Sequence, residues 1–197
     1  MVNAARMDRR VAVAALLRGR GADGLVVCGL GSPSYDVHAA GDRDDTFYLW
    51  GAMGAAALVG LGLARAQPER PVLVVTGDGE QLMAFGSLAT IAVARPRNLA
   101  IAVVDNGHYG ETGMQASHTG RGIDLARIAA ACGFAEARSL CDLAEVEALG
   151  ASLFRPADGP RLYALQVAAD SPPRSLPVRD AVFLKNRFRA SLGLKPQ

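Results

Sequence analysis

Two short polar segments of this sequence carry residues that could do chemistry, and each directly follows an apolar run. The first is TGDGE, residues 76–80, and the second is DNGHYG, residues 105–110. Two glycines beside Asp78 allow backbone amides to approach an anion at the start of a helix. An aspartate in the same turn would repel a phosphate unless a cation lay between them, and Mg²⁺ binds carboxylate and phosphate oxygens together. The two segments therefore predict a diphosphate bridged by Mg²⁺, with a second oxygen ligand from the second segment.

The elements that must position these segments alternate between strands and helices. Residues 71–76 and 99–104 are continuous apolar runs rich in β-branched residues, which is typical of strands buried on both faces. The remaining strands are expected at residues 24–28, 46–50, 134–140 and 161–167, and helices at 9–20, 54–66, 80–95, 123–132, 142–154 and 180–192. This alternation predicts a doubly wound α/β fold, with a mostly parallel sheet of about six strands and helices on both faces. Ligands of such folds bind at the carboxyl ends of the strands, where both polar segments lie.

Length and charge describe one domain with a small basic extension. The chain has 197 residues, is 50% hydrophobic and carries a net charge of +2, so no overall field points to nucleic acid or a membrane as a partner. A proline-rich stretch, residues 171–177, separates residues 1–170, the expected cofactor-binding domain, from a basic terminal helix within 171–197. The basic residues of this C-terminal segment are Arg174, Arg179, Lys185, Arg187, Arg189 and Lys195. The helix is expected either to present a solvated face or to dock onto a partner subunit.

Several classes of protein are excluded by missing patterns. The chain has no G-x-x-x-x-G-K-[ST] segment and no G-x-G-x-x-G between a strand and a helix; Gly60 and Gly62 lie inside an expected helix, where close packing explains them. The three cysteines form no metal motif, are expected in the core and favour a reducing compartment. No secretory signal is evident, and the longest apolar stretch, residues 52–64, is too short to cross a bilayer. A cytoplasmic protein is expected.

The motif that runs from Gly77 to Asn106 resembles the cofactor motif of the thiamine diphosphate-dependent enzymes. In that family a GDG segment after a buried strand is followed, about one helix and one strand later, by an asparagine. The segment Gly51-Ala52-Met53-Gly54 is similar to the segment of the family that grips the centre of the cofactor. The GSPS segment at 31–34 and the loop at 109–115 further resemble the sulfopyruvate decarboxylase β subunits and the C-terminal part of phosphonopyruvate decarboxylases.

The resemblance implies a role for each matching residue. Asp78 and Asn106 would hold Mg²⁺ through side-chain oxygens and His108 through its backbone carbonyl. The amides of Gly79 and Glu80 and the hydroxyl of Ser32 would bind the diphosphate, the carbonyl of Gly51 the aminopyrimidine, and Met53 would support the bent cofactor from below. Gly77 and Tyr109 complete the expected cofactor-binding set. Glu80 and Ala52 stand where many relatives have serine, so the Glu80 side chain is expected to point away from the diphosphate.

Each of these residues also has a simpler structural interpretation. Asp78 could cap a helix, Asn106 with Gly107 could form a tight turn, and Met53 could be an ordinary core residue. Among the other polar residues, His118 and Tyr35 are the candidates for substrate contact or catalysis. His38 and Arg121 are further candidates, and Arg121 could pair with an acidic substrate group.

The resemblance implies one subunit of a heteromeric decarboxylase of small 2-oxo acids that uses thiamine diphosphate and Mg²⁺. In the family, the glutamate that activates the cofactor belongs to a pyrimidine-binding domain, which this sequence does not contain. We therefore expect a pyrimidine-binding α-type partner, an active site shared between the two and a homo- or hetero-oligomeric assembly. The alternatives are an acetolactate synthase-like enzyme, a 2-oxoacid oxidoreductase β subunit, or a module that binds the cofactor without catalysis.

Overall fold

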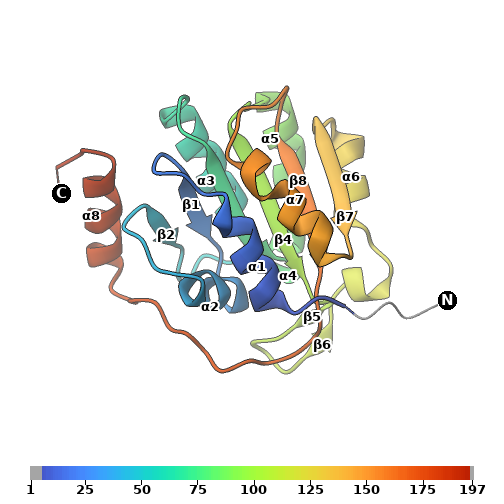
Figure 1. Cartoon of the computed structure of the whole chain (residues 1–197). Coiled ribbons are helices and arrows are strands. Elements are labelled where there is room, and N and C mark those ends of the chain that lie inside the picture. Colours follow the sequence, from blue (N-terminus) through green and yellow to red (C-terminus); the bar gives the residue numbers. More distant parts are fainter. Residues whose placement is uncertain (1–5, 196–197) are drawn as a thin grey trace.

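A six-stranded parallel sheet forms the centre of the protein, as predicted (Figure 1). The computed structural model describes residues 6–195, and its strands lie in the order β2-β1-β3-β4-β8-β7. Their bounds are β1 Leu25–Cys28, β2 Thr46–Tyr48, β3 Val72–Gly77, β4 Leu99–Asp105, β7 Glu136–Leu140 and β8 Arg161–Gln166. All five pairings between neighbouring strands are parallel.

Helices cover both faces of this sheet and enclose two hydrophobic clusters. One face carries α1 (Arg9–Arg18), α2 (Ser32–Ala39) and α7 (Leu143–Leu153), and the other carries α3 (Ala56–Ala66), α5 (Ser87–Ala94) and α6 (Leu125–Cys132). Strand β3 shows why its sequence lacks polar alternation: Leu73 and Val75 point into the first cluster, and Val72 and Val74 into the second. The doubly wound fold is therefore confirmed.

Several local predictions were wrong. The helix expected at 80–95 is two helices, α4 (Asp78–Met83) and α5, separated around Gly86, because Ala84 leaves helical geometry. Helix α2 was not expected, although Pro33 in its first turn is a recognised start signal. The small hairpin of β5 (His108–Tyr109) and β6 (Gln115–Ala116) and the 3₁₀ turn Thr119–Arg121 are too short to show any periodicity.

The three cysteines are free, and only one of them lies in the core. Cys28 is fully buried in β1, Cys132 is half-buried at the end of α6, and Cys141 is exposed just after β7. The expectation of three core cysteines was wrong for Cys141, because the residue follows the last apolar position of its strand. Within the part of the chain that the structure describes, no helix is both long and apolar enough to cross a membrane.

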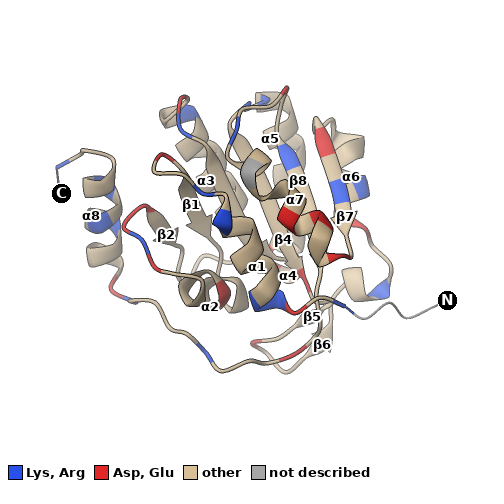
Figure 2. Ribbon diagram, viewed as in Figure 1, with Lys and Arg blue, Asp and Glu red and all other residues tan. Residues whose placement is uncertain are grey.

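The C-terminal segment returns to the same domain. After β8 the chain passes beneath α2 and rises to α8 (Ala181–Ser191), which packs beside the edge strand β2 (Figure 1). Phe188 of α8 contacts Phe47 with ring centroids 5.5 Å apart, and Arg187 forms an ion pair with Asp42 at 2.7 Å. Basic residues mark α8 in Figure 2, while its buried residues Leu184 and Phe188 join the hydrophobic clusters of the domain. The division of the chain at residue 170 stays a prediction.

Gly60 of α3 provides a test of this packing. A Cβ atom at residue 60 would lie 2.2 Å from Cγ2 of Val74, whereas a Cβ atom at residue 62 would meet nothing within 4 Å. We expect Gly60→Ala to lower the free energy of unfolding by about 1–3 kcal/mol through overpacking. Gly62→Ala, the matched control, should raise stability by up to about 1 kcal/mol through helix propensity. Chemical denaturation measures both, and equal effects of the two substitutions would contradict the packing of α3 on β3.

Candidate functional site

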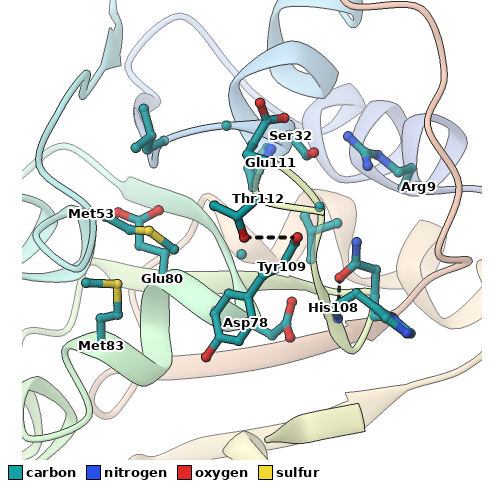
Figure 3. Close-up of a pocket in the computed structure, with 18 residues that line it drawn as sticks. Arg9, Ser32, Met53, Asp78, Glu80, Met83, His108, Tyr109, Glu111 and Thr112 are labelled. Atoms are coloured by element: carbon teal, nitrogen blue, oxygen red, sulfur yellow. Dashed lines mark hydrogen bonds between the residues drawn. The ribbon is translucent and has the colours of Figure 1, made fainter. Parts of the chain in front are cut away.

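The carboxyl ends of β1, β3 and β4 meet at the point where the strand order reverses, and a cavity opens there. Strand β1 leads outward to β2, while β3 and β4 follow on its other side, so the loops after these strands diverge. They surround a cavity of about 310 Å³ (Figure 3). Its lining includes nine of the ten residues predicted to bind the cofactor: Ser32, Met53, Gly77, Asp78, Gly79, Glu80, Asn106, His108 and Tyr109.

Asp78, at the start of α4, is buried and oriented by two hydroxyl groups. Its side chain is 2% exposed, and its Oδ2 accepts hydrogen bonds from Ser117 Oγ and from Thr119 Oγ1, the latter at 2.9 Å. Burial raises the pKa of this carboxyl, and Asp105 nearby raises it further. Gly77, not Asp78, is the N-cap of α4, and no side-chain cap bond forms there. Asp78 is therefore not a helix cap, and its carboxylate is held at the cavity by the loop that follows β6.

The loop after β4 is a tight turn with its polar atoms turned inward. Gly107 has φ +73°, and Asn106 Oδ1 accepts a hydrogen bond from the backbone amide of His108 at 2.9 Å. The Nδ1 atom of His108 lies 2.9 Å from the carbonyl oxygen of Asn106. Asp105 accepts hydrogen bonds from the amide of Gly107, from Gln166 and from Thr119. This network fixes Asn106 and Asp78 on the same side of the cavity.

Gly79 and Tyr109 lie in close contact where these two loops approach each other. A Cβ atom at residue 79 would lie 2.6 Å from the ring of Tyr109, so glycine is required for that ring to lie over the first turn of α4. Figure 3 shows Tyr109 between Asp78 and Thr112, on the wall of the cavity that comes from the β5–β6 hairpin.

Glu80 lies at the same end of the cavity as Met53 (Figure 3). Its carboxylate is 3% exposed, accepts a hydrogen bond from Thr76 Oγ1 at 2.9 Å and another from the amide of Gly54 at 3.3 Å. The side chain thereby links strand β3 to the segment that carries Met53. Burial raises the pKa of this carboxyl, while the hydrogen bonds from Thr76 and from backbone amides oppose that change.

This raised pKa gives a pH-dependent prediction. The folded protein holds a proton on Glu80 at pH values where the unfolded chain has lost it, so stability falls as pH rises from the ordinary glutamate pKa through the raised one. Glu80→Gln removes this dependence. We expect the variant to gain in melting temperature relative to the wild type as pH rises through that window, measured by thermal unfolding without cofactor. A difference that stays constant with pH would show that Glu80 titrates normally.

The segment around Met53 reaches the cavity only in part. Met53 lines it and is 41% exposed, which is not the burial of an ordinary core methionine. Gly51 has φ +75°, a conformation that favours glycine, but it is the one predicted cofactor residue that does not line the cavity. Its predicted contact with an aminopyrimidine stays a prediction.

The candidates for substrate contact are scattered around the site. His118 is exposed and lines a separate shallow pocket with Phe85 and Ile123, and Arg121 is exposed in the 3₁₀ turn. Tyr35 lines a small side cavity, with its hydroxyl 3.5 Å from Glu111 Oε2. His38 lies 2.8 Å from Ser175 Oγ and serves to hold the C-terminal segment. The structure brings none of these four residues into the main cavity, and their proposed roles stay predictions.

Three residues of the site were missed by the sequence reasoning. Ser117 and Thr119 orient Asp78 from 39 and 41 residues away in the chain, and no spacing rule announces such partners. Arg9, in the first turn of α1, lines the cavity and is 4% exposed. The sequence did contain a sign that Arg9 is unusual. Two consecutive arginines at the start of an expected helix are unfavourable there, because the helix dipole places its positive end at the N-terminus.

The donor set at the cavity suits a hard cation that is completed by a ligand. In the part of the chain that the structure describes, no group of three or more His, Cys, Asp or Glu side chains could hold a metal ion. One carboxylate (Asp78), one amide oxygen (Asn106) and backbone carbonyls are oxygen donors that fit Mg²⁺, which commonly takes its remaining ligands from phosphate and water. Gly77 and Gly79 line the same cavity as these donors.

Fold and site together define a class of cofactor-binding domain, and comparison with known proteins gives the family. Residues 35–162 match the family described as thiamine pyrophosphate enzyme, C-terminal TPP binding domain. The chain belongs to this family. A 4-hydroxybenzoylformate decarboxylase of Rhodococcus jostii, described as thiamine diphosphate-dependent, shares the fold with a TM-score of 0.70, 19% identity, and coverage of 86% of this chain and 34% of that one.

Two curated relatives are similar over much of the chain. The phosphonopyruvate decarboxylase of Streptomyces viridochromogenes is 40% identical over 98% of this chain and 48% of its own length. The sulfopyruvate decarboxylase subunit beta of Methanothermobacter thermautotrophicus is 43% identical over 64% of this chain and 68% of its own length. The chain thus spans about half the length of the first of these relatives and two thirds of the second. The resemblance inferred from the motifs is confirmed.

Proposed function

We propose that this chain supplies the half of a thiamine diphosphate-dependent 2-oxoacid decarboxylase that binds the diphosphate and Mg²⁺, with sulfopyruvate or phosphonopyruvate as the substrate. The observation that carries the proposal is the cavity at the switch point of the sheet, which is lined by both the oriented carboxylate of Asp78 and the turn of Asn106. The names of the relatives support the reaction and the substrate class.

The residues of this chain would bind and orient the cofactor. Asp78 Oδ2 is fixed by the hydroxyls of Ser117 and Thr119, so the carboxylate can offer its other oxygen to Mg²⁺ without rearranging. Asn106 and the carbonyl of His108 would complete the protein ligands. The first-turn amides of α4, at Gly79 and Glu80, and the hydroxyl of Ser32 would bind the phosphate oxygens.

The remaining geometry would set the shape of the bound cofactor. Met53 lies at the opposite end of the cavity from Arg9 and is held by the Gly54–Glu80 hydrogen bond, which suits a support beneath the central part of an extended ligand (Figure 3). When bound, thiamine diphosphate supplies the carbanion and electron-sink chemistry of decarboxylation. The protein's part is to exclude water and fix the orientation. The activating glutamate would come from a pyrimidine-binding α-type domain on a partner chain, in the cytoplasm.

The experiment combines this chain with a pyrimidine-binding α-type subunit and measures release of carbon dioxide from sulfopyruvate, phosphonopyruvate and pyruvate. We expect turnover that requires both chains, Mg²⁺ and thiamine diphosphate, with an acidic substituent preferred over the methyl group of pyruvate. Cofactor binding without turnover of any 2-oxo acid would favour the alternative of a non-catalytic module. Condensation of two pyruvates without net aldehyde release would favour an acetolactate synthase-like enzyme.

A further inference from the structure

Arg9 lies at the opposite end of the cavity from Met53 (Figure 3). Figure 3 shows its guanidinium pointing from α1 toward the cavity, on the opposite side from Met53 and Glu80. The side chain is about 95% buried, and Ser32, Asn106 and Gly110 line the cavity with it. A charged group so deeply buried needs partners of opposite charge or acceptor atoms.

Within residues 6–195, the guanidinium of Arg9 donates two hydrogen bonds. Arg9 Nε donates to Asp36 Oδ2 at 2.8 Å, and Nη1 donates to the carbonyl oxygen of Asp170 at 3.4 Å. A guanidinium has five N–H donors in a planar fork, which suits phosphate oxygens. The fixed Nε–Asp36 bond holds that fork in place at the cavity wall.

The position of Arg9 at the start of α1 carries an electrostatic cost. Arg9 and Arg10 are the first two residues of α1, where the positive end of the helix dipole disfavours cations. Arg10 does not line the cavity, and Arg9 is the only Lys or Arg among the lining residues. All of the lining residues belong to the described part of the chain. The same lining carries three carboxylates, Asp78, Glu80 and Glu111. Arg174, the next arginine nearby, is engaged with Glu111 at 3.1 Å beside a smaller cavity.

We propose that Arg9 binds the terminal phosphate of the cofactor. This inference rests on the proposed function. If Asp78 and Asn106 hold the metal and Met53 supports the central part, the diphosphate extends from Met53 past the metal toward Arg9. The guanidinium would then neutralise the charge that a single Mg²⁺ leaves on the diphosphate, in a cavity whose lining also carries three carboxylates.

The test compares thiamine diphosphate with thiamine monophosphate, which lacks the terminal phosphate. Binding of each is measured by calorimetry with Mg²⁺, using this chain together with its pyrimidine-binding domain. We expect Arg9→Gln to weaken binding of the diphosphate by about 10- to 100-fold and that of the monophosphate by less than about 3-fold. Arg9→Lys should recover part of the loss, because the charge is kept while the fork is not.

Arg10→Gln is the matched control. Arg10 also contacts Asp36, at 3.5 Å, but its side chain is 29% exposed and it does not line the cavity. The Arg10→Gln substitution should leave the preference for thiamine diphosphate over thiamine monophosphate unchanged. Thermal unfolding of the cofactor-free variants shows whether they are folded. Equal weakening of both ligands by Arg9→Gln, or no weakening of either, would overturn the inference. Failure of the wild type to bind thiamine diphosphate would instead contradict the proposed function.

Discussion

Replacement of Asp78 by alanine is expected to reduce Mg²⁺-dependent binding of thiamine diphosphate by at least about 100-fold, because the variant loses the only side-chain carboxylate proposed as a metal ligand. The hydroxyls of Ser117 and Thr119, which orient this carboxylate, would then lose the oxygen atom to which they donate. Calorimetric titration with and without Mg²⁺ measures the effect. The variant should also lose the metal dependence itself, so that any residual binding is the same in both conditions.

Asp124 provides the control for a purely structural aspartate. It is the N-cap of α6, where its side chain accepts hydrogen bonds from the amides of Ala126 and Arg127. Asp124→Ala should lower the free energy of unfolding by about 0.5–2 kcal/mol without changing cofactor affinity. If Asp78→Ala behaved in the same way, with lower stability and unchanged binding, Asp78 would have to be regarded as a structural residue.

Replacement of Asp36 by alanine is expected to cause the largest loss of stability. Asp36 is fully buried in α2 and forms ion pairs with Arg9 at 2.8 Å and Arg10 at 3.5 Å. Removing one partner of a buried pair leaves the other charge uncompensated, which costs about 3–5 kcal/mol. Chemical denaturation of the cofactor-free protein measures the change.

The exposed pair of Arg18 and Glu147 is the comparison for this prediction. These side chains lie 2.9 Å apart but are 64% and 47% exposed, so water screens them. Glu147→Ala should cost less than about 1 kcal/mol. If Asp36→Ala cost no more than Glu147→Ala, the pairing of α1 with α2 through Arg9 would contribute little to the fold.

The sequence predicted the structure best where a pattern of residues is compatible with few structures. Continuous apolar runs at β3 and β4 could hardly be anything but strands covered on both faces, and the six-stranded sheet followed from them. Asp78 and Asn106 were predicted to lie together because parallel strands end at the same edge, and both line one cavity. Gly60 was correctly interpreted as a packing glycine, whereas Gly62 faces open space.

The parts that the sequence did not reveal depend on contacts between distant segments. Helix α4 ends at Met83 and Ala84 leaves helical geometry before α5 begins, and an apolar stretch with one glycine does not reveal that break. Ser117 and Thr119 reach Asp78 only after the β5–β6 hairpin has folded back. His118 is adjacent to both residues in the chain, but it lines a separate pocket with Phe85, and its role in substrate contact stays a prediction.

The assignment of the cavity as the diphosphate and Mg²⁺ site is tested most directly by a calorimetric titration of thiamine diphosphate into this chain combined with its pyrimidine-binding domain, with Mg²⁺ and with a chelator. We expect saturable binding, one cofactor per cavity, that requires the metal ion and is lost in Asp78→Ala. Saturable binding of equal strength with the chelator present, or no binding in either condition, would contradict the assignment of this cavity as the diphosphate and Mg²⁺ site.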